Sequence, residues 1–143
     1  MYGWALVSKS KPDAVEDIYG WSMMRRCSEG ARIGPVYARD AETAKVVLAV
    51  ATKATTAAYI RSIPMQGEAM SSWDEAQINE GASMVAEVWT GNAEAQAVFE
   101  SLGWMPAGVD YHRMWLDGKA TGAQSEGGLA SAGLFAVFDA AVG

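Results

Sequence analysis

The sequence predicts an α/β (α+β) fold, with a mixed, partly parallel twisted sheet flanked by helices. The apolar runs follow the order strands, helix, strand, helix, strand, strand, and a long helix crossing between neighbouring strands makes those strands parallel. The chain has 143 residues, of which 50% are hydrophobic and 20% charged, so it can form one substantial core and is not a disordered chain. We therefore expect residues 1–143 to be a single domain.

The N-terminal part contains two predicted strands. The apolar run Gly3 to Ser8 ends in a turn at residues 10–13, whereas residues 13–31 are mixed and give no clear prediction. A second strand covers Arg32 to Ala38 and contains Pro35. Because proline lacks the amide hydrogen that a sheet requires, this strand should bulge, splay or lie at an edge there.

The next predicted element is a long helix that begins near Asp40. Asp40 can cap the free amides of its first turn, and Glu42 complements the helix dipole. A 3.6-residue period of mostly small apolar residues predicts close packing of this helix on the sheet. The stripe consists of Ala44, Val47, Leu48, Ala51 and Ala58.

Residues 62–82 are polar and rich in turn residues, and we interpret them as a surface insertion. A strand over residues 83–89 follows, and then a helix over residues 92–102 that stops at Gly103. Its apolar stripe is Ala95, Val98, Phe99 and Leu102.

The C-terminal part is predicted to contain two more strands around a loop. Val109 to Leu116 and Leu134 to Phe138 have the composition of strands, and Gly118 to Gly128 forms the glycine-rich loop. The loop lacks the Lys-Ser/Thr pair that follows the glycines of a phosphate loop, so we interpret it as a simple connection.

Composition restricts the possible partners and location. A net charge of −6 argues against nucleic-acid binding, because clustered cations are needed to neutralise phosphates. No run approaches about 18 continuous apolar residues, which argues against a membrane span. The single cysteine, Cys27, has no partner for an internal disulfide, and no signal peptide is visible, so we expect a cytoplasmic protein.

Several motifs together carry a family resemblance. In chain order they are Tyr2-Gly3-Trp4, Ile33-Gly34-Pro35-Val36-Tyr37-Ala38, the helix segment Asn92 to Trp104, and Arg113-Met114-Trp115. Their order and spacing resemble the GNAT superfamily of N-acetyltransferases, most closely the C-terminal acetyltransferase-like domain of two-module GNAT proteins. Compared with that family, the chain lacks the usual first strand and first two helices. We therefore expect either a fragment of a longer protein or a reduced domain whose sheet is completed by a homodimer or by a missing N-terminal partner module.

The resemblance implies an acetyl-CoA donor held between splayed strands. Residues of the predicted second strand and the turn after it, Val36, Tyr37, Ala38 and Arg39, would line the donor. In the family, the pyrophosphate lies on a glycine-rich turn at a helix N-terminus. Here that turn has no glycine and contains Asp40 and Glu42, whose carboxylates repel a pyrophosphate.

Two residues of the later helix segment have alternative roles. Asn92 is expected either to contact the pantetheine arm or a backbone group, or to cap the helix. Phe99 stands where many family members have a tyrosine that protonates the leaving thiolate. Phenylalanine has no hydroxyl for that step, so Phe99 lines the donor or belongs to the core.

The candidate catalytic residues are Glu87, Tyr37 and Tyr111. Glu87 lies in the middle of an apolar strand, where a carboxylate can act as general base, although strand alternation also allows it to point outward. Either tyrosine hydroxyl could act as the acid. One histidine and one cysteine offer no metal-binding cluster.

Two functions are consistent with these features. The first is an acyl-CoA-dependent N-acetyltransferase that transfers an acetyl group to a small-molecule or peptide amine by direct attack in a ternary complex. The alternative is a non-catalytic GNAT-like binding or dimerisation module without a working CoA site. The motif order favours the first function, and the absent phosphate turn favours the second.

Overall fold

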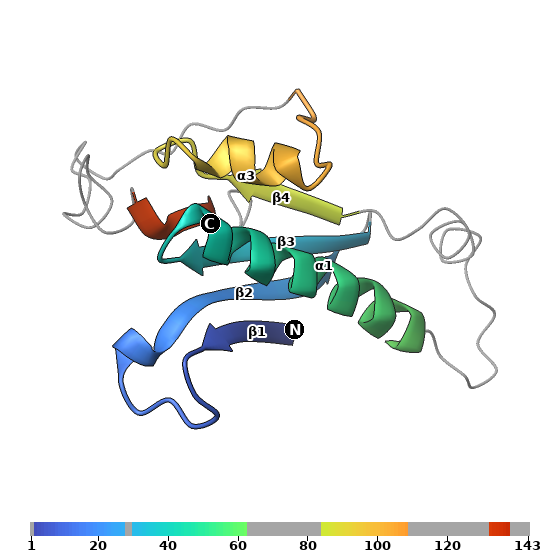
Figure 1. Ribbon diagram of the computed structural model, residues 1–143. Coiled ribbons are helices and arrows are strands. Elements are labelled where there is room, and N and C mark those ends of the chain that lie inside the picture. Colours follow the sequence, from blue (N-terminus) through green and yellow to red (C-terminus); the bar gives the residue numbers. More distant parts are fainter. Residues whose placement is uncertain (1, 28–29, 63–83, 109–131, 138–143) are drawn as a thin grey trace, which may run out of the picture.

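The computed structural model describes residues 2–27, 30–62, 84–108 and 132–137 (Figure 1). In these ranges the elements are β1 (Tyr2–Val7), a short 3-10 helix η1 (Val15–Asp17), β2 (Ile18–Cys27), β3 (Gly30–Ala38), α1 (Ala41–Ser62), β4 (Met84–Val88), α3 (Ala95–Ser101) and β5 (Leu134–Val137). The five strands form one sheet in the order β1-β2-β3-β4-β5, with a further pairing of β3 with β5. The β1–β2 and β2–β3 pairs are antiparallel and the β3–β4 pair is parallel, so the predicted mixed sheet is confirmed.

The longest strand, β2 (Ile18–Cys27), lies within residues 13–31, for which the sequence pattern makes no clear prediction. Its inward positions include Gly20 and Ser22, which are buried but are not large apolar residues. A Cβ added at Gly20 would lie 3.0 Å from Thr43 Cγ2 and 3.1 Å from Val47 Cγ2 of α1. Close packing of α1 on the sheet therefore requires small residues here, and their presence hides the alternation typical of a strand.

Pro35 lies within β3, which is a central strand with a neighbour on each side. The expected edge position is therefore wrong, whereas the expected bulge and splay are both found. In the pairing with β2, Ser22 lies opposite Val36 and Met24 lies opposite Ile33, so β3 has one extra residue between these pairs, at Gly34 and Pro35. On the other side, β3 pairs with β4 at Ala31 to Ile33 only, and then pairs with β5 at Val36 and Tyr37.

Helix α1 lies across one face of the sheet and packs on β1, β2 and β3 (Figure 1). It begins directly after Asp40, as predicted. The backbone amide of Thr43 donates to Asp40 Oδ1 at 2.7 Å, which is the hydrogen bond of a helix N-cap. The stripe is confirmed at its four positions with described side chains, because Ala44, Val47, Leu48 and Ala51 are all buried.

Helix α3 is shorter than predicted and packs against α1 and β5. Glu94 is its N-cap, so the expectation that Asn92 caps this helix is wrong. Asn92 instead stabilises the turn before the helix, where its Oδ1 accepts from the Glu94 amide at 3.0 Å. Ala95, Val98 and Phe99 are buried as predicted, but Leu102 is 37% exposed because the helix has already ended at Ser101.

The end of α3 has the hydrogen bonds of a Schellman motif. Gly103 has φ of 85°, its amide donates to the Glu100 carbonyl, and the Trp104 amide donates to the Phe99 carbonyl. The Phe99 and Trp104 rings meet edge to face with centroids 5.3 Å apart. Glycine tolerates the left-handed backbone, so the predicted stop at Gly103 is confirmed, although the last helical residue is Ser101.

Some predictions lie outside the described residues. They are the insertion over residues 62–82 beyond Ser62, the strand Val109 to Leu116, the glycine-rich loop, and Phe138 at the end of the last strand. The rest of that last strand is confirmed as β5. Within the described ranges, none of the helices combines the length and the apolar composition needed to cross a membrane.

Candidate functional site

The candidate site is the place where β3 and β4 stop pairing, which we call the strand fork and define by Val36, Val88 and Ala136. The parallel pairing ends at Ile33 and Ala86. Beyond that point Ala136 of β5 pairs with Val36 of β3 on one side and with Val88 of β4 on the other. One residue with a partner on each side shows that β5 lies between the two diverging strands.

Three further contacts hold this segment in the strand fork. The Trp89 amide donates to the Phe135 carbonyl at 3.0 Å, and Asn92 Nδ2 donates to the Ala132 carbonyl at 3.0 Å. Gly133 lies against the Tyr37 ring so closely that an added Cβ would be 2.5 Å from it. Phe135 and Ala136 are fully buried. The strand fork is therefore filled by the chain itself.

The N-terminus of α1 lies at the end of β3, where an anion would meet free amides. Here Asp40 already accepts the Thr43 amide. The pKa of Asp40 is lowered, first by the Thr43 backbone amide, then by the Thr43 hydroxyl, and also by the charge of Arg39. A carboxylate whose ionised form is favoured thus takes the place that a phosphate would need.

Arg39 is the cation next to this turn. Its Nε donates to Asp40 Oδ2 at 3.1 Å, and its guanidinium lies 3.7 Å from the centroid of the Tyr19 ring. The side chain is 55% exposed. Arg39 is therefore held by an ion pair and a cation–π contact with residues of the chain itself.

Glu87 makes an ion pair across the sheet. Its Oε1 accepts from Arg32 Nη1 at 2.5 Å, and the side chains are only 9% and 21% exposed. Parallel pairing of β3 and β4 brings these two residues together, although they are 55 positions apart. Strand alternation placed Glu87 on one face of β4, but nothing in the sequence identified Arg32 as its partner.

The other predicted site residues fall into two groups. Tyr37 is half-buried at the strand fork, and Asn92 is 5% exposed in the turn after β4, where it contacts Ala132. Val36, Ala38 and Phe99 are buried in the core. Tyr111 lies outside the described residues. Their roles in binding or catalysis stay predictions.

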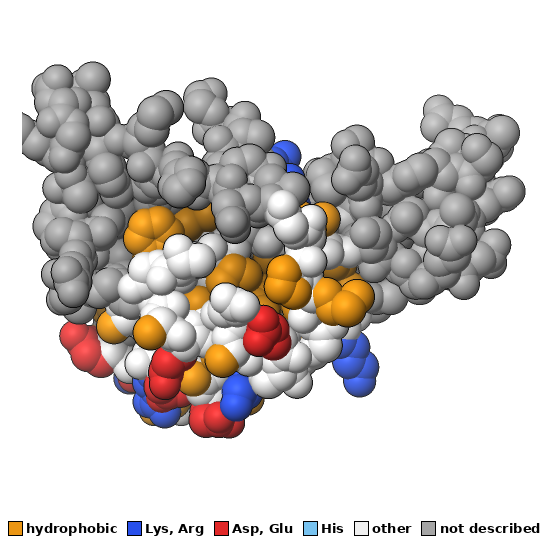
Figure 2. All heavy atoms as spheres, turned by 90° about the horizontal axis from the view of Figure 1, so that it is seen from above, with side chains coloured by type: hydrophobic (Ala, Val, Ile, Leu, Met, Phe, Trp, Pro, Cys, Tyr) orange, Lys and Arg blue, Asp and Glu red, His pale blue; other side chains and the backbone are white. Residues whose placement is uncertain are grey.

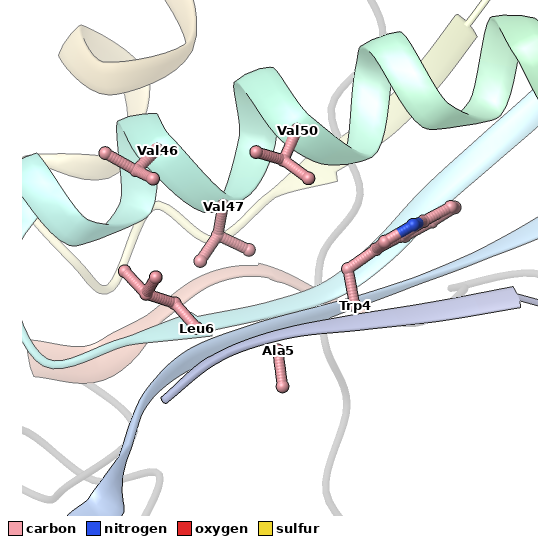
Figure 3. A pocket seen from close by; sticks show the side chains of 6 residues that line it. All are labelled: Trp4, Ala5, Leu6, Val46, Val47 and Val50. Carbon is pink, nitrogen blue, oxygen red and sulfur yellow. The ribbon is translucent and has the colours of Figure 1, made fainter. Parts of the chain in front are cut away.

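A separate apolar pocket of about 150 Å³ lies between β1 and α1 (Figure 3). Trp4 and Leu6 point toward Val46, Val47 and Val50 of the helix, whereas Ala5 points away from it. None of these six lining side chains can act as an acid or a base. Among the described residues, no three His, Cys, Asp or Glu side chains are placed to hold a metal ion.

Exposed hydrophobic side chains occur outside this pocket as well. Seen from above, hydrophobic side chains lie at the surface among polar ones, and most of the visible charged side chains lie in the lower half of the view (Figure 2). The large hydrophobic residues exposed in the described chain include Leu102 and Met105, the latter at 87%. Single exposed residues of this kind are ordinary for a folded protein.

Residues 8–100, more than half of the chain, match the family model of the acetyltransferase (GNAT) domain. The chain belongs to the GNAT acetyltransferase family. No match was found among curated proteins or among solved structures. The expected GNAT-like fold is thereby confirmed, including the splayed strands.

GNAT domains generally use acetyl-CoA, which needs an open gap between the splayed strands and free amides at the helix N-terminus. The described residues do not fit it in this conformation. The strand fork holds β5, and Asp40 takes the amide that a pyrophosphate oxygen would need. A site for the donor therefore requires a rearrangement at the strand fork.

Proposed function

We propose that this GNAT domain is an N-acetyltransferase with acetyl-CoA as donor and an amine as acceptor, reacting directly in a ternary complex. The observation that carries the proposal is the strand fork in a chain of this family. The divergence of two parallel strands exposes their backbone groups to a third chain or to an extended ligand. Glu87 and Tyr37, the candidate base and acid, lie on the two strands that form it.

The test is calorimetric titration of acetyl-CoA into the chain and into Gly133→Ala, with pantetheine and adenosine 3′,5′-diphosphate as fragment controls. The added methyl group would lie 2.5 Å from the Tyr37 ring, so the ring or the segment around Gly133 must shift, and we expect this shift to loosen the strand fork. We expect saturable one-to-one binding in at least the variant. If neither protein binds acetyl-CoA at millimolar concentration, the proposed function is wrong.

Glu87 is proposed as the general base. The substitution Glu87→Gln keeps the shape but removes the proton acceptor, so we expect acetyl transfer to fall by about 10²–10⁴-fold. The substitution Lys45→Gln, which removes an exposed ion pair on α1, is a control that should leave the rate unchanged. An unchanged rate in Glu87→Gln would exclude Glu87 as base.

For the acceptor, we propose a cationic amine. The net charge of −6 attracts positively charged molecules toward the protein, and dissolved salt shortens the range of this attraction. We expect kcat/KM for a polyamine or a lysine-containing peptide to fall as salt is raised, and to fall less for a neutral amine. Equal salt dependence of the two would contradict this choice.

A second candidate is a GNAT-like binding or dimerisation module without a working CoA site. Two observations favour it specifically, namely β5 in the strand fork and the carboxylate of Asp40 on the α1 amides. The titration above distinguishes the two candidates, because a module without a CoA site binds no acetyl-CoA even after the strand fork has been opened.

A further inference from the structure

The strand fork and β5 form an arrangement in which one segment meets two strands at once. Ala136 has a backbone partner on both sides, and Phe135 and Ala136 are fully buried. Any extended ligand that hydrogen-bonds to the same groups of β3 and β4 must displace residues 132–137. The segment and such a ligand therefore exclude one another.

Acetyl-CoA has the chemistry of such a ligand. Its pantetheine arm is an extended chain with two amide groups, which can hydrogen-bond to free backbone groups of a strand as a short peptide does. We propose that residues 132–137 are an internal competitor that reversibly closes the acetyl-CoA site, a role that rests on the proposed function.

The attachment of β5 is limited enough to be reversible. The strand has four residues, and its pairing with β3 is irregular between Val36 and Tyr37. Each side contributes only two paired positions. The side-chain hydrogen bond that ties the segment to the turn after β4 comes from Asn92. Loss of the buried Phe135 side chain from the core opposes release, so the closed form prevails without ligand.

Asn92 can be altered so that only one of its two contacts is lost. In Asn92→Asp, a carboxylate oxygen can still accept from the Glu94 amide, which preserves the turn. The other oxygen would face the Ala132 carbonyl without a hydrogen to donate. Asn92→Asp therefore detaches the segment electrostatically, whereas Gly133→Ala detaches it sterically.

A matched control is available at Gly3. A Cβ there would lie 3.6 Å from the nearest atom, the Ser22 carbonyl oxygen, which is an ordinary contact. Gly3 is in β1, which pairs with β2 at the other side of the sheet. Gly3→Ala therefore makes the same chemical change as Gly133→Ala without touching the strand fork.

The first experiment is hydrogen exchange of the backbone amides of residues 134–137 in the unaltered chain, with and without saturating acetyl-CoA. Ligands usually slow exchange, but a ligand that expels β5 must accelerate it at these amides. We expect at least a tenfold acceleration there, while the amides of β1 and β2 are unchanged or slower. Unchanged or slower exchange at residues 134–137 with acetyl-CoA bound would overturn the proposal.

The second experiment compares acetyl-CoA affinity among the variants. We expect Gly133→Ala and Asn92→Asp to bind at least tenfold more tightly than the unaltered chain and Gly3→Ala, because the fraction of open molecules rises. Equal affinity in all four would overturn the internal competitor and leave the proposed function intact. No binding in any of them, with residues 134–137 exchanging freely in the two variants, would overturn the proposed function itself.

Discussion

At the scale of single residues, the Asp40 carboxylate caps the N-terminus of α1 and so restricts anion binding there. The carboxylate accepts the Thr43 amide and forms an ion pair with Arg39. Both contacts favour the ionised form, and both occupy groups that could otherwise receive an anion. A phosphate-binding turn and an aspartate N-cap therefore exclude one another at this position.

The first prediction concerns this cap. Asp40→Ala removes the side-chain acceptor, so we expect the melting temperature to fall by about 3 °C. Asp40→Ser retains a cap without the charge and should melt close to the unaltered chain. Thermal unfolding followed by circular dichroism measures both, and equal melting of Asp40→Ala and the unaltered chain would show that the cap contributes no stability.

The second prediction concerns Asp17. The Ser8 hydroxyl, the Lys9 ammonium and the Asp13 amide lower the pKa of Asp17 to about 2. A carboxyl with a lowered pKa stabilises the fold above its unfolded pKa of about 3.9, and that stability is lost as the pH falls toward 2. In urea unfolding between pH 2 and 6, Asp17→Asn should lose less stability on acidification than the unaltered chain.

Ser8→Ala is the matched variant for this experiment. It removes the largest cause of the pKa shift but keeps the carboxyl group, so its acid sensitivity should lie between the other two proteins. If all three proteins lose the same stability from pH 6 to pH 2, the hydrogen bond between Ser8 and Asp17 does not form in solution.

At the scale of elements, α3 shows how a short helix is fixed at both ends. Asn92 orders the turn before it, and Gly103 and Trp104 terminate it with a Schellman motif. A seven-residue helix is not stable alone, so its stability comes from these ends and from its buried face.

The third prediction tests that face. Phe99 is 3% exposed and contacts Trp104, so Phe99→Ala should lower the free energy of unfolding by about 3–5 kcal/mol. Leu102 is 37% exposed after the helix end, and Leu102→Ala should lower it by less than about 1 kcal/mol. Similar losses in the two variants, measured by denaturant unfolding, would contradict the assigned face.

The elements also show where sequence prediction succeeds. Asp40 and the stripe Ala44 to Ala51 predicted α1 because capping and burial act locally along one helix. Strand β2 was missed because its inward positions Gly20 and Ser22 are not large apolar residues, and Gly20 leaves room for α1, a requirement set by another element. The helix expected over 92–102 was three residues too long at its start, since the Asn92 side chain orders a turn and not the helix.

At the scale of the whole molecule, β3 is the centre of the sheet. It pairs with β2 along most of its length, and with β4 and then β5 on its other side. Strand β1, by contrast, has the single partner β2 within the described sheet. The edge should therefore open more readily than the centre.

The fourth prediction follows from the difference in pairing between β3 and β1. Native-state hydrogen exchange should be slowest for paired amides of β3 and faster by at least tenfold for those of β1. The free energies of opening derived for β3 should approach that of global unfolding, whereas those for β1 should be clearly lower. Equal protection of β1 and β3 would indicate that β1 has a second partner in solution.

The sequence predicted the family and sheet type better than it predicted the site. Motif order depends on residues close together in the chain, and the match over residues 8–100 confirms what that order implied. The strand fork depends on contacts between distant segments, such as Arg32 with Glu87 and Asn92 with Ala132. Such pairs carry no local signal, and so the filling of the strand fork by β5 was not foreseen.

The position of β5 between β3 and β4 also has a consequence for protein synthesis. Both strands that border the strand fork are complete once residue 88 has been made, but the segment that fills it ends at residue 137. At translation rates of about 5–20 residues per second, the nascent chain spends several seconds with β3 and β4 complete while residues 132–137 have not yet been made. In that interval the backbone edges of β3 and β4 are open to chaperones and other chains. Slower translation between codons 88 and 137 should therefore increase aggregation.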